Sequence, residues 1–302
     1  MNKPFLPTLL LLLPFGVAAQ TPIHHWPLDA TSGTVALDIA GGAHGTLLNN
    51  CIWYPNGGHH GGALQANGNN AYVALGPCDI TTPPGDELTL SCWVRPHIVS
   101  AAERVLMAKS IGSADSDMIW SLSLVNNTAV RFRVRTAGTT RVLTSAPANI
   151  FSGAWYHVAG VYDGSEMRIY MNGALIATQA ATGSIGYHPQ SPATLFNITS
   201  AVYPYFGWID DARIYGHALD LLGIIDLVIG NVSTALPESE REQSNAPAGP
   251  VELLVLDRAG RQVGIHRMPS FPALPIAGYA SGSYTLVVQS ADSRWLSHMV
   301  VP

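Results

Sequence analysis

The chain has 302 residues and a formal net charge of -5, with 15 lysines and arginines against 20 aspartates and glutamates. The basic residues are scattered along the chain, which excludes the clustered basic stripe of a nucleic-acid-binding protein. Charged residues make up only 12% of the chain, whereas glycine (29) and proline (21) are plentiful. This balance is typical of many short strands joined by tight turns and indicates an all-β protein.

The N-terminus has the three parts of a secretory signal peptide. Lys3 supplies a positive charge, an apolar run covers Leu9 to Leu13, and Val17-Ala18-Ala19 forms a small-residue cleavage site. The sequence therefore predicts a signal peptide over residues 1–19, cut before Gln20, and a secreted protein. No later stretch reaches the roughly 18 apolar residues of a membrane-spanning helix, so we expect no transmembrane segment in the mature chain.

Alternating apolar residues predict strands through the middle of the chain, beginning with Leu88 to Val94, Trp120 to Val125 and Val130 to Val134. A three-stranded meander follows, with strands over Trp155 to Tyr162, Met167 to Met171 and Leu175 to Thr178. Asp163-Gly164 and Asn172-Gly173 separate these strands, and both dipeptides favour the turns that match strand twist. Helical periodicity is confined to a turn or two around Leu219 to Val228. These patterns predict an antiparallel two-sheet sandwich or jelly roll.

A further strand, Gly207 to Tyr215, carries two adjacent carboxylates, Asp210 and Asp211. Because side chains alternate along a strand, we expect the two to point to different faces. A carboxylate away from water needs a partner, which can be a backbone turn, an arginine or a hard cation.

The composition changes after Leu236 to a polar stretch that is too poor in apolar residues to fold, and residues 230–247 are therefore predicted to be a linker. Strand patterns resume beyond it and predict a small C-terminal β-sandwich over residues 248–302. The expected strands there are Val251 to Leu256, Val263 to His266, Leu274 to Ile276, Ala280 to Val288 and Met299 to Val301. The main domain then occupies residues 20–229.

Several blocks occur in an order that resembles the laminin G-like jelly-roll domains of the concanavalin A-like lectin and glucanase superfamily. They are Trp26 to Asp29, Asp38 to Leu47, Gly62 to Leu64 before Gly68 and Tyr72-Val73, Leu88 to Val94, Trp155 to Ala159, Tyr170 to Gly173, and Ile209 to Tyr215. The resemblance implies two curved antiparallel sheets, often with a structural calcium ion, that bind sugars or proteins outside the cell.

The C-terminal segment resembles the sorting domain of the bacterial type IX secretion system. The resemblance lies in the turn at Gly260-Arg261, the Ser281-Gly282-Ser283-Tyr284 strand and the apolar terminal strand, while Ser283 and Trp295 to His298 depart from the commonest pattern. It implies export by the type IX machinery, removal of the domain after export, and a location that is secreted or at the cell surface, associated with the outer membrane.

Catalytic residues are hard to find in this sequence. Glucanases of the superfamily carry a Glu-x-Asp-x-x-Glu strand, since retaining hydrolysis needs two carboxylates about 5 to 5.5 Å apart. Asp163 to Glu166 is the nearest candidate, but it lies on a hairpin tip and is better explained as a turn. We therefore expect a non-catalytic protein that binds an extracellular glycan or surface protein. The alternatives are a glycan-cleaving hydrolase or lyase, and a structural role in adhesion.

Asp29, Asp38 and Asp211 are the candidate calcium ligands, because the first and last strands of a jelly roll are neighbours and bring them near one another. The alternative is that Asp38 caps a glycine turn while Asp210 or Asp211 pairs with Arg213 or Arg95. Histidines at 24–25, 44 and 59–60 lack ligand spacing, so a zinc site is disfavoured.

Sugar recognition combines aromatic faces with polar hydrogen-bonding groups, which makes Tyr187 and the loop residues Tyr203, Tyr205 and Phe206 the candidate ligand-binding residues. Trp93, Trp155 and Trp208 lie within the predicted strands and are expected to be core residues. Of the three cysteines, Cys51 and Cys78 are the candidate disulfide, with three free thiols as the alternative.

Overall fold

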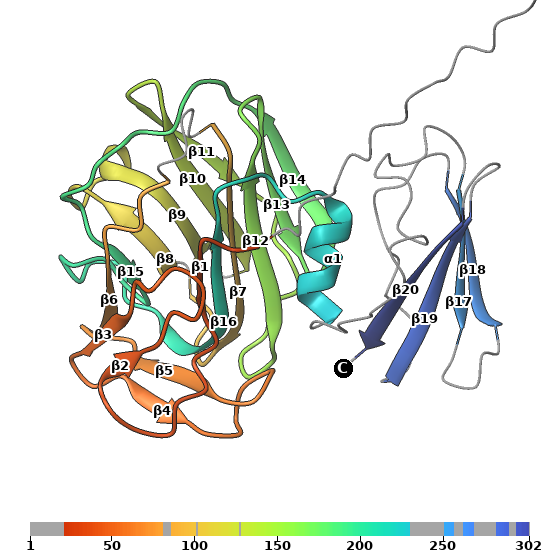
Figure 1. Ribbon diagram of the computed structural model, residues 1–302, viewed down its shortest axis with the longest axis horizontal. Helices are drawn as coiled ribbons and strands as arrows, with labels where there is room; N and C mark the ends of the chain where they lie inside the picture. The colour runs from red at the N-terminus through yellow and green to blue at the C-terminus, as the bar shows by residue number, and fades with distance from the viewer. Residues whose placement is uncertain are drawn as a thin grey trace, which may run out of the picture.

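The computed structural model describes residues 21–80, 86–100, 102–126, 128–229, 251–256, 262–268, 282–289 and 294–301. The predicted signal peptide, the predicted linker and the expected strand at residues 274–276 lie outside these ranges. Within them the main body is an antiparallel two-sheet jelly-roll sandwich, as predicted (Figure 1).

The first sheet has eight strands, and β1 (His24–Trp26) pairs with β16 off the main path. In spatial order the others are β14 (Ala174–Ala180), β13 (Glu166–Met171), β12 (Tyr156–Tyr162), β7 (Leu88–Pro96), β16 (Phe206–Tyr215), β5 (Ala63–Asn67) and β4 (Ile52–Tyr54). The predicted meander is confirmed as β12, β13 and β14. The first and last strands of the domain are neighbours, because His25 lies opposite Arg213.

The second sheet also has eight strands. In spatial order they are β11 (Thr139–Thr144), β10 (Ala129–Thr136), β9 (Met118–Val125), β8 (Arg104–Ser110), β15 (Ala193–Leu195), β6 (Tyr72–Gly76), β3 (Gly45–Leu48) and β2 (Val35–Ala36). A short 3-10 helix, Asp115–Asp117, leads into β9.

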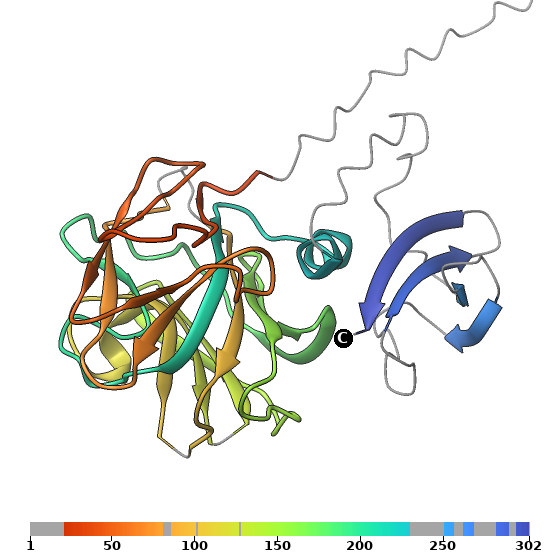
Figure 2. The same ribbon diagram turned by 90° about the horizontal axis from the view of Figure 1, so that it is seen from below.

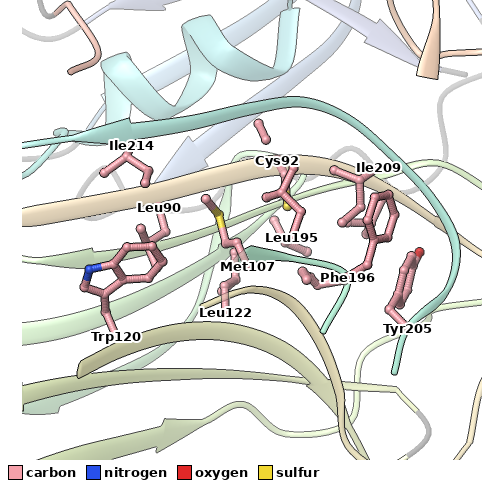
Figure 3. Packing of buried hydrophobic residues seen from close by; sticks show 14 of the residues in the cluster. Leu90, Cys92, Met107, Trp120, Leu122, Leu195, Phe196, Tyr205, Ile209 and Ile214 are labelled. Carbon is pink, nitrogen blue, oxygen red and sulfur yellow. The ribbon is translucent and has the colours of Figure 1, made fainter. Parts of the chain in front are cut away.

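The core lies between the sheets and follows strand alternation. Figure 3 shows Leu90, Cys92, Ile209 and Ile214 of the first sheet facing Met107, Trp120, Leu122 and Leu195 of the second. The sheets approach closely at Gly160, where a Cβ would lie 2.5 Å from the Phe132 ring. Glycine is therefore required on the core face of β12 at this point.

One helix, α1 (Leu221–Ile229), covers part of the outer face of the first sheet, and it is seen nearly end-on beside the green strands in Figure 2. Its Ile224 and Leu227 pack against Ala159 and Tyr170, which are outer-face residues of β12 and β13. The helical turns predicted around Leu219 to Val228 are confirmed.

The C-terminal strands form a four-stranded antiparallel sheet in the order β18 (Gln262–Met268), β17 (Val251–Leu256), β19 (Gly282–Gln289), β20 (Arg294–Val301). Four of the five strands expected after residue 248 correspond to these elements. Among the residues that the structure describes, no helix combines the length and apolarity needed to cross a membrane.

Candidate functional site

Asp210 and Asp211 lie on the same face of the first sheet, so the prediction that they point to opposite faces is wrong. The register of β16 against β7 shifts between Asp210 and Arg213, and Asp211 has a positive φ of 52°. This extra residue is a β-bulge, which interrupts the alternation of side chains. Ala212 enters the core, while both carboxylates face outward with the side chains of Trp93 and Arg213.

Asp211 is held by two cationic or hydrogen-bonding side chains. Its Oδ1 lies 2.5 Å from His25 Nε2, and its Oδ2 lies 2.8 Å from an Arg213 terminal nitrogen. Burial raises the pKa of Asp211, but the His25 hydrogen bond and the Arg213 charge outweigh it and lower the pKa below its usual value. The expected alternative of an Asp211–Arg213 ion pair is therefore confirmed.

Asp210 has a different environment from its neighbour. It is fully buried, its Oδ2 accepts a hydrogen bond of 2.8 Å from His60 N–H, and its Oδ1 has no partner among the described residues. Burial raises the pKa of Asp210 to about 7, and the charge of Asp211 adds to the effect of burial. The segment over Asp210 is the loop of residues 57–62, whose His59 ring stacks on Trp93 with centroids 3.4 Å apart.

Ser91 and His157 form a buried hydrogen-bonded pair beneath this loop. Ser91 Oγ lies 2.9 Å from His157 Nε2, and each residue is only 1% exposed. Burial and the charge of Arg213 lower the pKa of His157 to about 3, so the imidazole is neutral. Because the pair is closed to solvent, it is not placed to act on a substrate.

The predicted calcium ligands have hydrogen-bond donors of their own. Asp38 accepts hydrogen bonds from the backbone N–H groups of His25, Ala40, Gly41 and Ala43, which confirms that it caps a glycine turn. Asp29 Oδ1 accepts from Gly62 N–H at 2.6 Å. The described residues contain no group of three or more acidic, histidine or cysteine side chains placed to hold a metal. Calcium binding stays a prediction.

The predicted Cys51–Cys78 disulfide is not formed, because all three cysteines are free. Cys51 Sγ contacts Tyr72 O and Cys78 Sγ contacts Leu75 O, each at 3.5 Å. These carbonyls lie at opposite ends of β6, roughly 10 Å apart by strand rise. The two thiols therefore contact different parts of this strand and not each other.

The four predicted ligand-binding residues lie on different parts of the sandwich. Tyr187 precedes β15, and the other three lie where the chain crosses from β15 of the second sheet to β16 of the first. Tyr187 is 63% exposed and follows the bridge between Ile185 and the end of β10. Tyr203 packs outside the second sheet on the Val105 and Ile198 cluster. Tyr205 is 1% exposed and stacks on Phe196, so its assignment to the surface is wrong.

Phe206 belongs to an aromatic surface that we call the Trp208 face, formed by Tyr54, Arg95, His97, Phe206 and Trp208. The indole of Trp208 contacts the rings of Tyr54 and His97 edge-on, with centroids 5.7 and 5.8 Å apart. The His97 ring also lies 4.3 Å from that of Phe206. Tyr54 is 45% exposed, and His97 is exposed.

Backbone register explains why these residues meet. Trp208 lies opposite Arg95 of β7 on one side and Gln65 of β5 on the other, so all three belong to one row across the outer face. The adjacent Ile209 points into the core. Gly57 permits the close approach of the Tyr54 ring, which a Cβ at that position would strike.

Three side chains of this face, Arg95, His97 and Trp208, were missed as ligand-binding candidates. Trp208 was expected in the core because aromatic residues dominate sandwich cores. Trp208 is buried as expected, at 9% exposure, but it lies on the outer face of the sheet and not between the sheets, and the alternation with Ile209 is the signal for this. Arg95 was considered only as an ion-pair partner for Asp210 or Asp211. In the structure it pairs with neither of them and donates a hydrogen bond to Gly153 O.

Comparison with known families gives a match over most of the sandwich. The laminin G family model described as "Concanavalin A-like lectin/glucanases superfamily" matches residues 67–223. Pappalysin-1 from Mus musculus is 30% identical over 107 residues, which is 32% of this chain and 7% of the length of that protein. This chain therefore spans only a small part of that curated relative.

Solved structures with the same fold include domain 4 of AbnA, an extracellular arabinanase of Geobacillus stearothermophilus solved in complex with arabinotriose. It aligns with a TM-score of 0.53 at 20% identity, covering 68% of this chain and 98% of that domain. The receptor-binding domain of botulinum neurotoxin type G aligns with a TM-score of 0.50 at 13% identity, covering 91% of this chain and 74% of the other. At these identities the likeness shows the fold.

Proposed function

The chain belongs to the concanavalin A-like lectin/glucanase superfamily, and from this membership we propose that it is a non-catalytic binding protein whose ligand is an extracellular glycan held on the Trp208 face. The observation that carries the proposal is that the exposed or partly exposed rings of Tyr54, His97 and Phe206 surround the buried indole of Trp208 and lie beside polar groups on the outer face of a lectin fold. Sugar rings stack their C–H surfaces on aromatic side chains and hydrogen bond to nearby polar groups.

The Trp208 face lies on a part of the sheet that no helix packs against among the described residues. Farther along the same outer face, α1 packs over β12 and β13, and His59 stacks on Trp93. At the Trp208 end, the indole Nε1 has no hydrogen-bond acceptor within the described structure. This nitrogen is buried within the chain, so the surface open to a ligand is formed by the exposed rings of Tyr54 and His97 around the indole.

The two structural neighbours support a binding role, because one was solved with an arabinose trisaccharide and the other is a receptor-binding domain. An adhesive role at the cell surface is compatible with the same face.

We place the protein outside the cell, exported through the type IX system by its C-terminal strands. Deleting residues 248–302 is expected to abolish export in a host that has this system, measured by the amount of protein in the medium and on the cell surface.

Retention on a panel of immobilised polysaccharides tests the binding proposal. The purified chain is compared with Tyr54→Ala and with Tyr187→Ala, a matched removal of an exposed tyrosine elsewhere. Loss of one stacking ring is expected to raise the dissociation constant about tenfold in Tyr54→Ala, and less than about twofold in Tyr187→Ala. Failure of every glycan to bind, or equal binding by Tyr54→Ala and the natural chain, would refute the proposal. Repeating the assay with a chelator tests the calcium prediction.

A further inference from the structure

Arg95 is held in one orientation at two points. Its guanidinium carbon lies 4.9 Å over the centre of the Trp208 ring, and its Nε donates a hydrogen bond of 2.8 Å to Gly153 O. Stacking and the Nε bond fix the plane of the guanidinium group. The hydrogen bond to Gly153 uses only Nε and leaves the two terminal nitrogens, which are the pair that makes bidentate contacts with planar anions.

Arg95 has no carboxylate partner within the described residues, although several other arginines do. Arg168 pairs with Asp163, Arg213 with Asp211, and Arg133 with Glu103. Of the two carboxylates farther along β16, Asp211 is paired with Arg213 and Asp210 is buried beneath the loop of residues 57–62. The positive charge of Arg95 is therefore not neutralised by Asp210 or by Asp211.

The other side chains of the face carry no negative charge. Around Arg95 they supply the phenol of Tyr54, the imidazole of His97 and the rings of Phe206 and Trp208, and Gln65, opposite Trp208 on β5, adds an amide. The face thus presents a fixed, unpaired guanidinium beside aromatic rings, on a chain whose formal net charge is -5. An arginine oriented in advance loses little entropy when it binds a carboxylate.

We infer that the Trp208 face selects glycans that carry a carboxylate, with Arg95 binding the uronate group through its two terminal nitrogens while the sugar ring lies on the neighbouring aromatic residues. The inference rests on the proposed glycan-binding function and adds the class of sugar. Both carboxylate oxygens accept hydrogen bonds from the guanidinium fork, so the contact depends on geometry as well as charge.

Polygalacturonate and its methyl ester are suitable probes, because they share one sugar ring and differ in the negative charge of the carboxyl group. Binding of each is measured by calorimetry for the natural chain, Arg95→Gln, Arg95→Lys and Arg141→Gln. Arg141 is an exposed arginine on β11 and serves as the matched control. Thermal unfolding of each variant verifies that the fold is kept.

The natural chain is expected to bind the acid at least about tenfold more tightly than the ester. Arg95→Gln should reduce this ratio to below about twofold by weakening the binding of the acid much more than that of the ester, while Arg95→Lys should keep only part of the ratio because lysine lacks the planar fork. Arg141→Gln should behave as the natural chain.

Equal binding of acid and ester by the natural chain, or an equal loss of both in Arg95→Gln, would overturn the inference. If the chain binds only neutral glycans of the panel, the uronate inference fails and the proposed function stands. If it binds no glycan at all, the proposed function fails and the inference falls with it.

Discussion

At Asp211 the backbone of β16 takes a left-handed conformation, which aspartate tolerates better than most residues. The bulge brings its carboxylate to His25 of β1 and to Arg213, and so joins the first and last strands of the domain. The charge pair is buried, and removal of one partner leaves the other uncompensated.

We expect Asp211→Ala to lower the free energy of unfolding by about 3 kcal/mol, measured by chemical denaturation. Asp211→Asn keeps the side chain best suited to positive φ and should lose less. A loss below about 0.5 kcal/mol in the alanine variant would contradict a role for this carboxylate in holding β1.

Asp38 provides a test with pH dependence. Burial raises its pKa, but hydrogen bonds from His25 N–H, His24 and the turn amides outweigh burial and lower the pKa from 3.8 to about 2. Its contribution to stability is therefore complete above pH 3.8 and is lost as the pH falls to about 2.

Asp38→Asn should cost about 2 kcal/mol at neutral pH, because an amide nitrogen then faces backbone donors. The difference in unfolding free energy between variant and natural chain should narrow as the pH falls below 3.8. A difference that stays constant with pH would show that the ionised carboxylate is not the stabilising form.

At the scale of elements, α1 covers part of the outer face of the first sheet with apolar side chains. Ile224 is fully buried against the outer residues of β12 and β13. Truncating it leaves a cavity between the helix and the sheet.

Ile224→Ala is expected to destabilise the protein by about 3 kcal/mol in thermal or chemical unfolding. Val202→Ala, at a side chain that is 50% exposed, is the control and should change the unfolding free energy by less than about 0.5 kcal/mol. If Ile224→Ala and Val202→Ala lower the unfolding free energy by the same small amount, α1 does not pack on the sheet in solution.

At the scale of the whole molecule, the sandwich depends on burial between its sheets and on no disulfide in its described residues. Burial raises the pKa of the Cys51 thiol to about 11 and that of Cys78 to about 12, so neither ionises readily. A thiol assay of the unfolded, unreduced chain is expected to find three free thiols, and the native chain should react slowly. Detection of a single thiol would instead establish a disulfide.

Much of the sandwich was predictable because its signals are local. The Asp163-Gly164 and Asn172-Gly173 turns define the meander, and alternation identifies the inner residues of β7 and β9. The assignment of Tyr203, Tyr205 and Phe206 to one surface failed, since the path of the chain between the sheets decides which side each faces. The bulge at Asp211 was also missed, because strict alternation cannot foresee an inserted residue.

Hydrogen–deuterium exchange with and without a bound glycan tests the central claim most directly, since it locates the contact surface on the intact chain. Protection is expected in peptides covering β4, the end of β7 together with His97 just after it, and the start of β16 from Phe206 to Trp208. Protection confined to the opposite sheet or to residues 184–203 would contradict the assignment of the Trp208 face as the ligand-binding surface.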